Sequence, residues 1–147
     1  MTSSKSWLRR RSEIPLSRAA CILEQRKIGD GKIFVTDSLN FRVQVLEPDG
    51  RFIHSFGKAG DSPGYFSRPK GVATDSHGHI YVVDALMHAV QIFNAKGELL
   101  IAFGEQGQGV GQFWLPNGIF ISSDNMIFVA DAYNKRVQVF RYVGHDL

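Results

Sequence analysis

The sequence predicts an all-β fold of short antiparallel strands, because one strand-rich phrase recurs along the chain in a fixed register. Asp37, Asp84 and Asp131 lie 47 residues apart. No insertion interrupts this step between Asp30 and Tyr142. The same spacing relates Val43, Val90 and Val137; Gln44, Gln91 and Gln138; Gly57 and Gly104; Gly64 and Gly111; Phe66 and Phe113; Pro69 and Pro116; and Gly71 and Gly118. Such a repeat indicates one supersecondary unit that is stacked several times.

One unit can be followed in order from Gly71. Residues 71–75 and 80–83 are two β-prone runs joined by a turn, and a loop at 84–88 leads to an alternating apolar and polar run at 89–93. A turn ending at Gly97 precedes a fourth strand at 98–103, and the glycine-rich segment 104–117 leads to the next unit. Four short antiparallel strands per period are typical of a β-propeller blade.

The fold class is therefore a partial β-propeller of three four-stranded antiparallel blades, some of them incomplete. Units are expected near residues 30–70, 71–117 and 118–142. The Gly-Val-Ala-x-Asp strand of the other units is missing upstream of Asp30, where the matched positions are Glu24, Gln25, Arg26 and Ile28. We accordingly expect ten strands, grouped as three, four and three.

The repeats resemble the NHL repeat family. The resemblance rests on 126–131 (Met-Ile-Phe-Val-Ala-Asp) followed by 134–140 (Asn-Lys-Arg-Val-Gln-Val-Phe), with a second copy at 31–37 and 40–45. It covers residues 30–142 and implies a six-bladed ring whose faces bind proteins, RNA or small ligands. The present chain would supply about half of such a ring.

Residues 1–29 are expected to be a basic tail, either disordered or a short helix. They hold seven Lys or Arg and two acidic residues, whereas residues 30–147 have a net charge of −2. No apolar run is long enough to span a bilayer and the basic start lacks an apolar signal core, so we expect no membrane insertion. The compartment stays open, with the cytoplasm as the default, and the single Cys21 excludes an intramolecular disulfide.

Half a ring leaves two outer blade faces uncovered. Large apolar surfaces are unusual on soluble monomers. We therefore expect either that two chains complete one ring or that the sequence is a fragment of a longer protein.

The candidate binding site is one face of the propeller, on which the loops between second and third strands meet the loops between blades. Aromatic and basic side chains on one rim suit a protein or anionic partner. The recurring Asp37, Asp84 and Asp131 are interpreted as loop caps that accept backbone N–H groups. The candidate binding residues are Arg42, Lys58, Arg68, Lys70, His88, Trp114, Tyr133, Lys135 and Arg136.

No catalytic residue, metal ligand or cofactor is predicted. His77 and His79 flank a turn on the opposite face with no third histidine nearby, so we interpret them as surface residues. The leading hypothesis is a noncatalytic interaction module or scaffold for a protein partner. The alternatives are a fragment of a metal-dependent lyase or lactonase-like propeller, and an RNA-binding NHL propeller.

Overall fold

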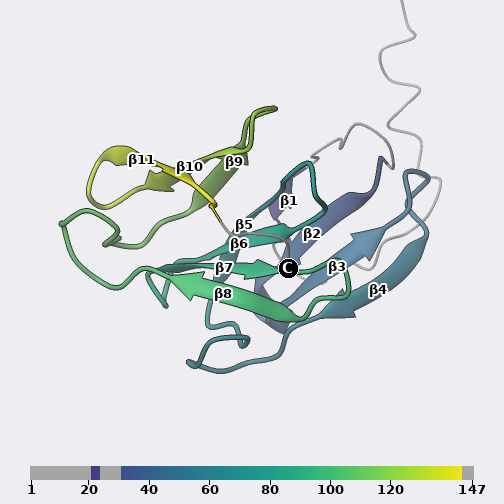
Figure 1. Ribbon diagram of the computed structural model, residues 1–147. Helices are drawn as coiled ribbons and strands as arrows, with labels where there is room; N and C mark the ends of the chain where they lie inside the picture. Colours follow the sequence, from purple (N-terminus) through teal and green to yellow (C-terminus); the bar gives the residue numbers. More distant parts are fainter. Residues whose placement is uncertain (1–20, 24–30, 144–147) are drawn as a thin grey trace, which may run out of the picture.

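The computed structural model describes residues 21–23 and 31–143, which form three antiparallel sheets set side by side (Figure 1). The first sheet contains β1 (Cys21–Leu23), β2 (Ile33–Asp37), β3 (Arg42–Leu46) and β4 (Phe52–Phe56). The second contains β5 (Pro69–Thr74), β6 (Ile80–Asp84), β7 (Ala89–Phe93) and β8 (Leu99–Phe103). The third contains β9 (Gly118–Ile121), β10 (Met126–Asp131) and β11 (Arg136–Arg141). Strands that follow one another in sequence are neighbours in each sheet, as in a propeller blade.

Strand β1 corrects the expected strand count. It pairs antiparallel with β2, with Ile22 opposite Val35, so the first sheet has four strands and the described chain has eleven. The count of ten was wrong because it was based on the recurring sequence pattern, which is missing before Asp30. Sheet pairing needs only backbone N–H and C=O groups, so a strand can form there without that pattern. The other residues of the predicted 1–29 tail lie outside the described part of the chain, and their disorder or helicity stays a prediction.

The hydrophobic core lies between the sheets. One cluster joins the first and second sheets through Val43, Val45, Val72 and Val82, and another joins the second and third through further aliphatic side chains. Each cluster includes a phenylalanine from the segment between two sheets, Phe66 in one and Phe113 in the other, and both are fully buried. These two phenylalanines lie 47 residues apart, so the repeat places one fully buried ring at each interface between sheets.

The recurring glycines allow the backbone to approach these interfaces. Gly57 and Gly104 have φ values of +104° and +108°, and a Cβ at either position would overlap the ring of Phe66 or Phe113. A Cβ on Gly71 would lie 3.1 Å from the backbone nitrogen of Ile119 in β9. The innermost strands β5 and β9 thus pack closely, as expected near a propeller axis.

Helical structure in the described residues is limited to the 3-10 turn Ser38–Asn40. It ends at Phe41, whose φ of 54° is left-handed, and His88 and Lys135 share this conformation with φ values of 51° and 54°. The loop between second and third strands therefore has a common backbone feature in all three sheets. No helix in the described ranges combines the length and hydropathy that a bilayer crossing requires.

Candidate functional site

Two sets of loops meet at one edge of the sheets, and we call this surface the loop face. One set joins the second and third strands of each sheet (Asp37–Arg42, Asp84–Ala89 and Asp131–Arg136), and the other joins neighbouring sheets (residues 57–68 and 104–117). The two sets are held together by hydrogen bonds between backbone groups. Ala85 donates to the carbonyl of Arg68, and Tyr133 donates to that of Trp114. The expectation that these loops share a face is confirmed.

Asp84 holds two segments of the loop face together in the second sheet. Its carboxylate is fully buried and accepts the backbone N–H groups of Ser67 and Arg68 at 2.7–3.0 Å. It also accepts those of Leu86 and Met87 at 3.1 Å. The carboxylate thus joins the incoming segment to its own loop, which confirms the predicted capping role at this position.

Asp131 has the equivalent position in the third sheet but uses mainly side chains. It accepts the backbone N–H of Trp114, the amides of Asn134 and Gln138, and the guanidinium Nε of Arg136 at 2.8 Å. Burial alone would raise the pKa of Asp131, but these hydrogen bonds outweigh burial and hold that pKa below its usual value. The carboxylate is therefore kept ionised by the groups that it orients.

The repeated glutamines bind the segment that precedes their sheet. Gln91 accepts the backbone N–H of Gly64 at 2.6 Å and donates to the carbonyl of Tyr65. Gln138 repeats this one unit later, with Gly111 as donor and Gln112 as acceptor. Sequence analysis found these glutamines as repeat positions but did not find their role. Their constant step from Gly64 and Gly111 was the signal.

The junction of the second and third sheets carries most of the candidate binding residues. The rings of Trp114 and Tyr133 are stacked, with centroids 5.3 Å apart, and Tyr133 is 64% exposed. Lys135, two residues after Tyr133 in the same loop, is exposed. Arg136 is half-buried because its guanidinium also donates to the carbonyls of Gly109 and Gln112. The structure therefore joins the aromatic pair to Arg136 through Asp131, with Lys135 on the same loop as Tyr133.

His88 lies in the same region but has an internal role. Its ring nitrogen Nδ1 accepts the backbone N–H of Leu115 at 3.1 Å. In this arrangement Nδ1 carries no proton. His88 is half-buried and helps to hold the segment that follows Trp114.

The remaining candidate residues belong to the junction of the first and second sheets. Arg42 pairs with Asp37 at 3.0 Å, and the ammonium of Lys58 lies 4.8 Å from the centre of the Tyr65 ring. Arg68 is exposed, and its backbone N–H is held by Asp84. The carbonyl of Lys70 accepts a hydrogen bond from Thr36. Each of these four residues has a different partner, and Lys70 lies within β5 (Pro69–Thr74), so the contacts do not join them into one group.

A hydrogen-bonded cluster lies at the opposite edge of the second sheet. Asp75 accepts two backbone N–H groups, from His77 and His79, as well as the ring Nδ1 of His79 and the hydroxyl of Tyr81. Burial acts to raise the pKa of Asp75, but the hydrogen bonds led by that from His79 lower it overall. Burial raises the pKa of Tyr81, and the charge of Asp75 adds to this effect. Because its carboxylate is saturated, Asp75 orients its neighbours and closes the turn.

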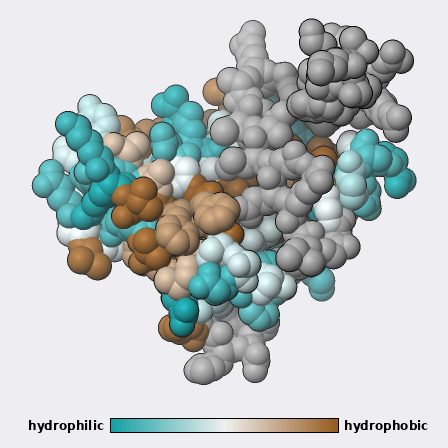
Figure 2. Space-filling model, turned by 90° about the horizontal axis from the view of Figure 1, so that it is seen from above, coloured by the Kyte–Doolittle hydropathy of each residue, from teal (hydrophilic) through white to brown (hydrophobic). Residues whose placement is uncertain are grey.

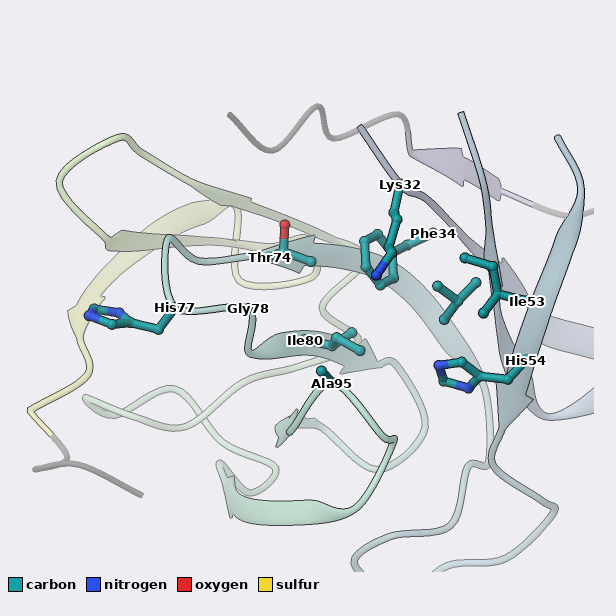
Figure 3. A pocket seen from close by; sticks show the side chains of 10 residues that line it. Lys32, Phe34, Ile53, His54, Thr74, His77, Gly78, Ile80 and Ala95 are labelled. Carbon is teal, nitrogen blue, oxygen red and sulfur yellow. The ribbon is translucent and has the colours of Figure 1, made fainter. Parts of the chain in front are cut away.

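A cleft of about 220 Å³ opens between the first and second sheets (Figure 3). Phe34, Ile53 and Ile80 form apolar walls, and Lys32 and His54 contribute nitrogen atoms. None of the candidate binding residues lines this cleft. It is therefore a surface distinct from the loop face.

Three features define a β-propeller segment. They are the stacked sheets, the phenylalanine buried at each sheet interface, and the shared loop face. A family model described as DUF5128, 6-bladed beta-propeller, matches residues 20–90 and 71–145. The chain belongs to this six-bladed β-propeller family. The match does not confirm the NHL assignment, and no curated protein matches the sequence.

Solved structures agree with this fold. A structure titled streptogramin B lyase has a TM-score of 0.58 and 17% identity over 84% of this chain and 40% of its own. A catalytically inactive virginiamycin B lyase from Staphylococcus aureus with quinupristin has a TM-score of 0.57 and 15% identity, over 84% and 41%.

A structural genomics protein of unknown function from Bacteroides thetaiotaomicron has a TM-score of 0.61 and 17% identity, over 74% of this chain and 32% of its own. The chain thus spans less than half the length of these structures. At such identities the likeness shows the fold alone.

Proposed function

We propose that the chain is a noncatalytic interaction module that binds a protein partner through the loop face. The observation that carries the proposal is the stacked pair of Trp114 and Tyr133. Aromatic and arginine side chains that are presented by a rigid backbone are the usual anchors of protein interfaces. The finer assignment to NHL repeats rests on the quoted motifs and belongs to the same proposal.

The stacked pair is fixed before any partner arrives. The backbone of Trp114 donates to Asp131 and accepts from Tyr133, so both residues are held by groups other than their own rings. Arg136 is fixed by the same carboxylate at 2.8 Å. A preorganised surface loses little conformational entropy on binding, which favours affinity.

The lyase alternative lacks comparable support. The inner strands β5 and β9 present Val72, Ala73, Ile119 and Ile121 as buried apolar side chains. Among the described residues, one group of three metal-ligating side chains was found, Asp75, His77 and His79, and its carboxylate already accepts four hydrogen bonds. The RNA alternative uses the same aromatic pair and exposed lysines, so one set of variants tests both.

The test is to select peptides from a display library on the immobilised chain and to measure their affinity by calorimetry. For Trp114→Ala with Tyr133→Ser we expect about a 30-fold loss, which corresponds to roughly 2 kcal/mol for an interface anchor. Phe52→Ser is the matched control, because Phe52 is 61% exposed on β4, away from the loop face.

Equal affinity for the double variant and the native chain would overturn the protein-binding proposal. Single-stranded RNA that binds at low salt and is lost in the double variant would favour the RNA alternative instead. Circular dichroism of each variant verifies that the sheets are retained.

A further inference from the structure

The turn between β5 and β6 brings together three side chains that can bind a metal ion. A carboxylate oxygen of Asp75 and one ring nitrogen each from His77 and His79 lie within 4.8 Å of one another. Asp75 is buried, His79 is half-buried and His77 is exposed. Figure 2 shows hydrophobic side chains gathered on the half of the molecule where the third sheet lies in Figure 1, so this polar turn differs in chemistry from that surface.

The carboxylate of Asp75 leaves one nitrogen of His79 available to an ion. Nδ1 of His79 donates to Oδ2 of Asp75 at 2.8 Å, so the proton is on Nδ1 and the lone pair is on Nε2. The ring also packs edge-on against that of Tyr142, with centroids 5.8 Å apart. A histidine that donates one ring N–H to a carboxylate and offers its other nitrogen has the arrangement usual for metal ligands. Asp75 already accepts four hydrogen bonds, so it holds His79 and is not itself a ligand.

His77 can supply a second nitrogen. Its ring centroid lies 6.0 Å from that of His79. The backbone N–H groups of both histidines are held by Oδ1 of Asp75 at 2.9 Å, so the turn fixes where the two side chains begin. Figure 3 shows the ring of His77 directed away from Ile80 and His54. Two nitrogens on one Zn²⁺ lie about 3.3 Å apart, and a rotation of the exposed His77 ring reaches this separation.

Closure of this kind of turn does not itself require histidines. One repeat later the matched positions are Ser122, Asp124 and Met126. That turn is closed by the hydroxyl of Ser122, which accepts the backbone N–H of Met126 at 3.1 Å. The two imidazoles of the second sheet are therefore additional to what the turn needs.

We propose that His77 and His79 bind a divalent transition-metal ion such as Zn²⁺, with Asp75 as a positioning residue and water in the remaining coordination positions. Imidazole nitrogens suit Zn²⁺, Ni²⁺ and Cu²⁺, whereas Mg²⁺ and Ca²⁺ prefer oxygen ligands. The site lies at the opposite edge of the second sheet from the loop face, so it is independent of the partner proposed there. An ion that binds the folded turn also stabilises the folded chain.

Calorimetric titration of the tag-free chain with Zn²⁺ tests the site, in a Cys21→Ser background that removes the single thiol. We expect one ion per chain and no displacement by excess Mg²⁺. His77→Ala and His79→Ala should each remove the binding, whereas His54→Ala, on β4, should leave it unchanged. A parent chain that binds no Zn²⁺ overturns the proposal, as does displacement by Mg²⁺ or undiminished binding by either alanine variant of the site.

The role of Asp75 is tested separately. Asp75→Asn keeps one oxygen for the turn and removes the acceptor of the His79 Nδ1–H, so we expect a loss of about 10–100-fold in Zn²⁺ affinity. Tyr81→Phe is the matched control, because it removes only the other hydrogen bond to Oδ2, at 3.0 Å, and should leave the affinity unchanged. NMR of the His79 ring nitrogens reads which of them binds the ion, and circular dichroism verifies that each variant is folded. Unchanged affinity in Asp75→Asn, or binding through Nδ1, would overturn the positioning role.

Discussion

The loops of the second and third sheets perform the same task with different chemistry. In the second sheet, Asp84 accepts only backbone N–H groups, and the neighbouring Met87 and Ala89 offer it no polar side chain. In the third sheet, Asp131 accepts one backbone N–H and three side-chain donors, including that of Arg136. A buried carboxylate is needed in both loops, but the side chains around it can change once enough backbone donors point at it.

This comparison predicts the largest effects for removal of the two carboxylates. Asp84→Ala leaves several buried N–H donors without an acceptor, so we expect a loss of about 3 kcal/mol or more of unfolding free energy. Asp131→Ala should cost roughly 1–2 kcal/mol, because Arg136 is partly exposed and still reaches two carbonyls. Urea unfolding followed by circular dichroism measures both losses. A larger loss for Asp131→Ala would contradict the distinction between the loops.

The glutamine contacts should give a smaller difference in the same direction. Gln91 is fully buried and makes hydrogen bonds to Gly64 and Tyr65, whereas Gln138 is half-buried. We expect a loss of about 2 kcal/mol for Gln91→Ala and about 1 kcal/mol for Gln138→Ala. The same unfolding assay measures them. Equal losses would show that burial does not separate the two sites.

The smallest expected effect is on how the unfolding free energy depends on pH in the acid range. Because hydrogen bonds hold the pKa of Asp131 below its usual 3.8, its ionisation stabilises the fold above that pH and the contribution is lost as pH falls through the lowered value. Unfolding free energy measured from about pH 5 to about pH 2.5 should fall less for Asp131→Asn than for the native chain, by no more than about 1 kcal/mol. Identical slopes would mean that Asp131 does not contribute.

The repeat made most of the fold predictable. Its fixed step located every strand from β2 to β11. The interpretation of the recurring aspartates as caps of turn N–H groups is confirmed at Asp84. It holds only in part at Asp131, which accepts one backbone N–H and three side-chain donors, and at Asp37 the bonds come from the side chains of Asn40, Arg42 and Gln44.

Of the two outer blade faces that were expected to be uncovered, the one on the third sheet exposes Val137 and Val139, whereas Val35 and Leu46 on the outer side of the first sheet are buried. Strand β1 was missed because it pairs through its backbone and lacks the sequence pattern of the repeat.

Side-chain partners were less predictable than strands. The stacking of Trp114 on Tyr133 joins residues of two different loops, and the glutamine contacts cross from one sheet to the segment before it. Such contacts depend on how the sheets are placed together, which local patterns do not encode. His88 was grouped with the binding residues for its chemistry, whereas its ring nitrogen is used within the protein.

The left-handed backbone at Phe41, His88 and Lys135 has a consequence for how this surface can diversify. This position of the repeat has the same backbone conformation in all three sheets, with φ values between 51° and 54°. Its side chain is an aromatic ring in the first sheet, an imidazole in the second and an ammonium group in the third. An L-residue with a side chain meets a steric cost there, which is largest for β-branched residues, so this backbone restricts the residue type without fixing it. Exchanging the exposed Lys135 would alter what the third sheet presents to solvent, whereas exchanging Phe41, which packs against a core cluster, or His88, which accepts the N–H of Leu115, would also disturb the contacts beneath.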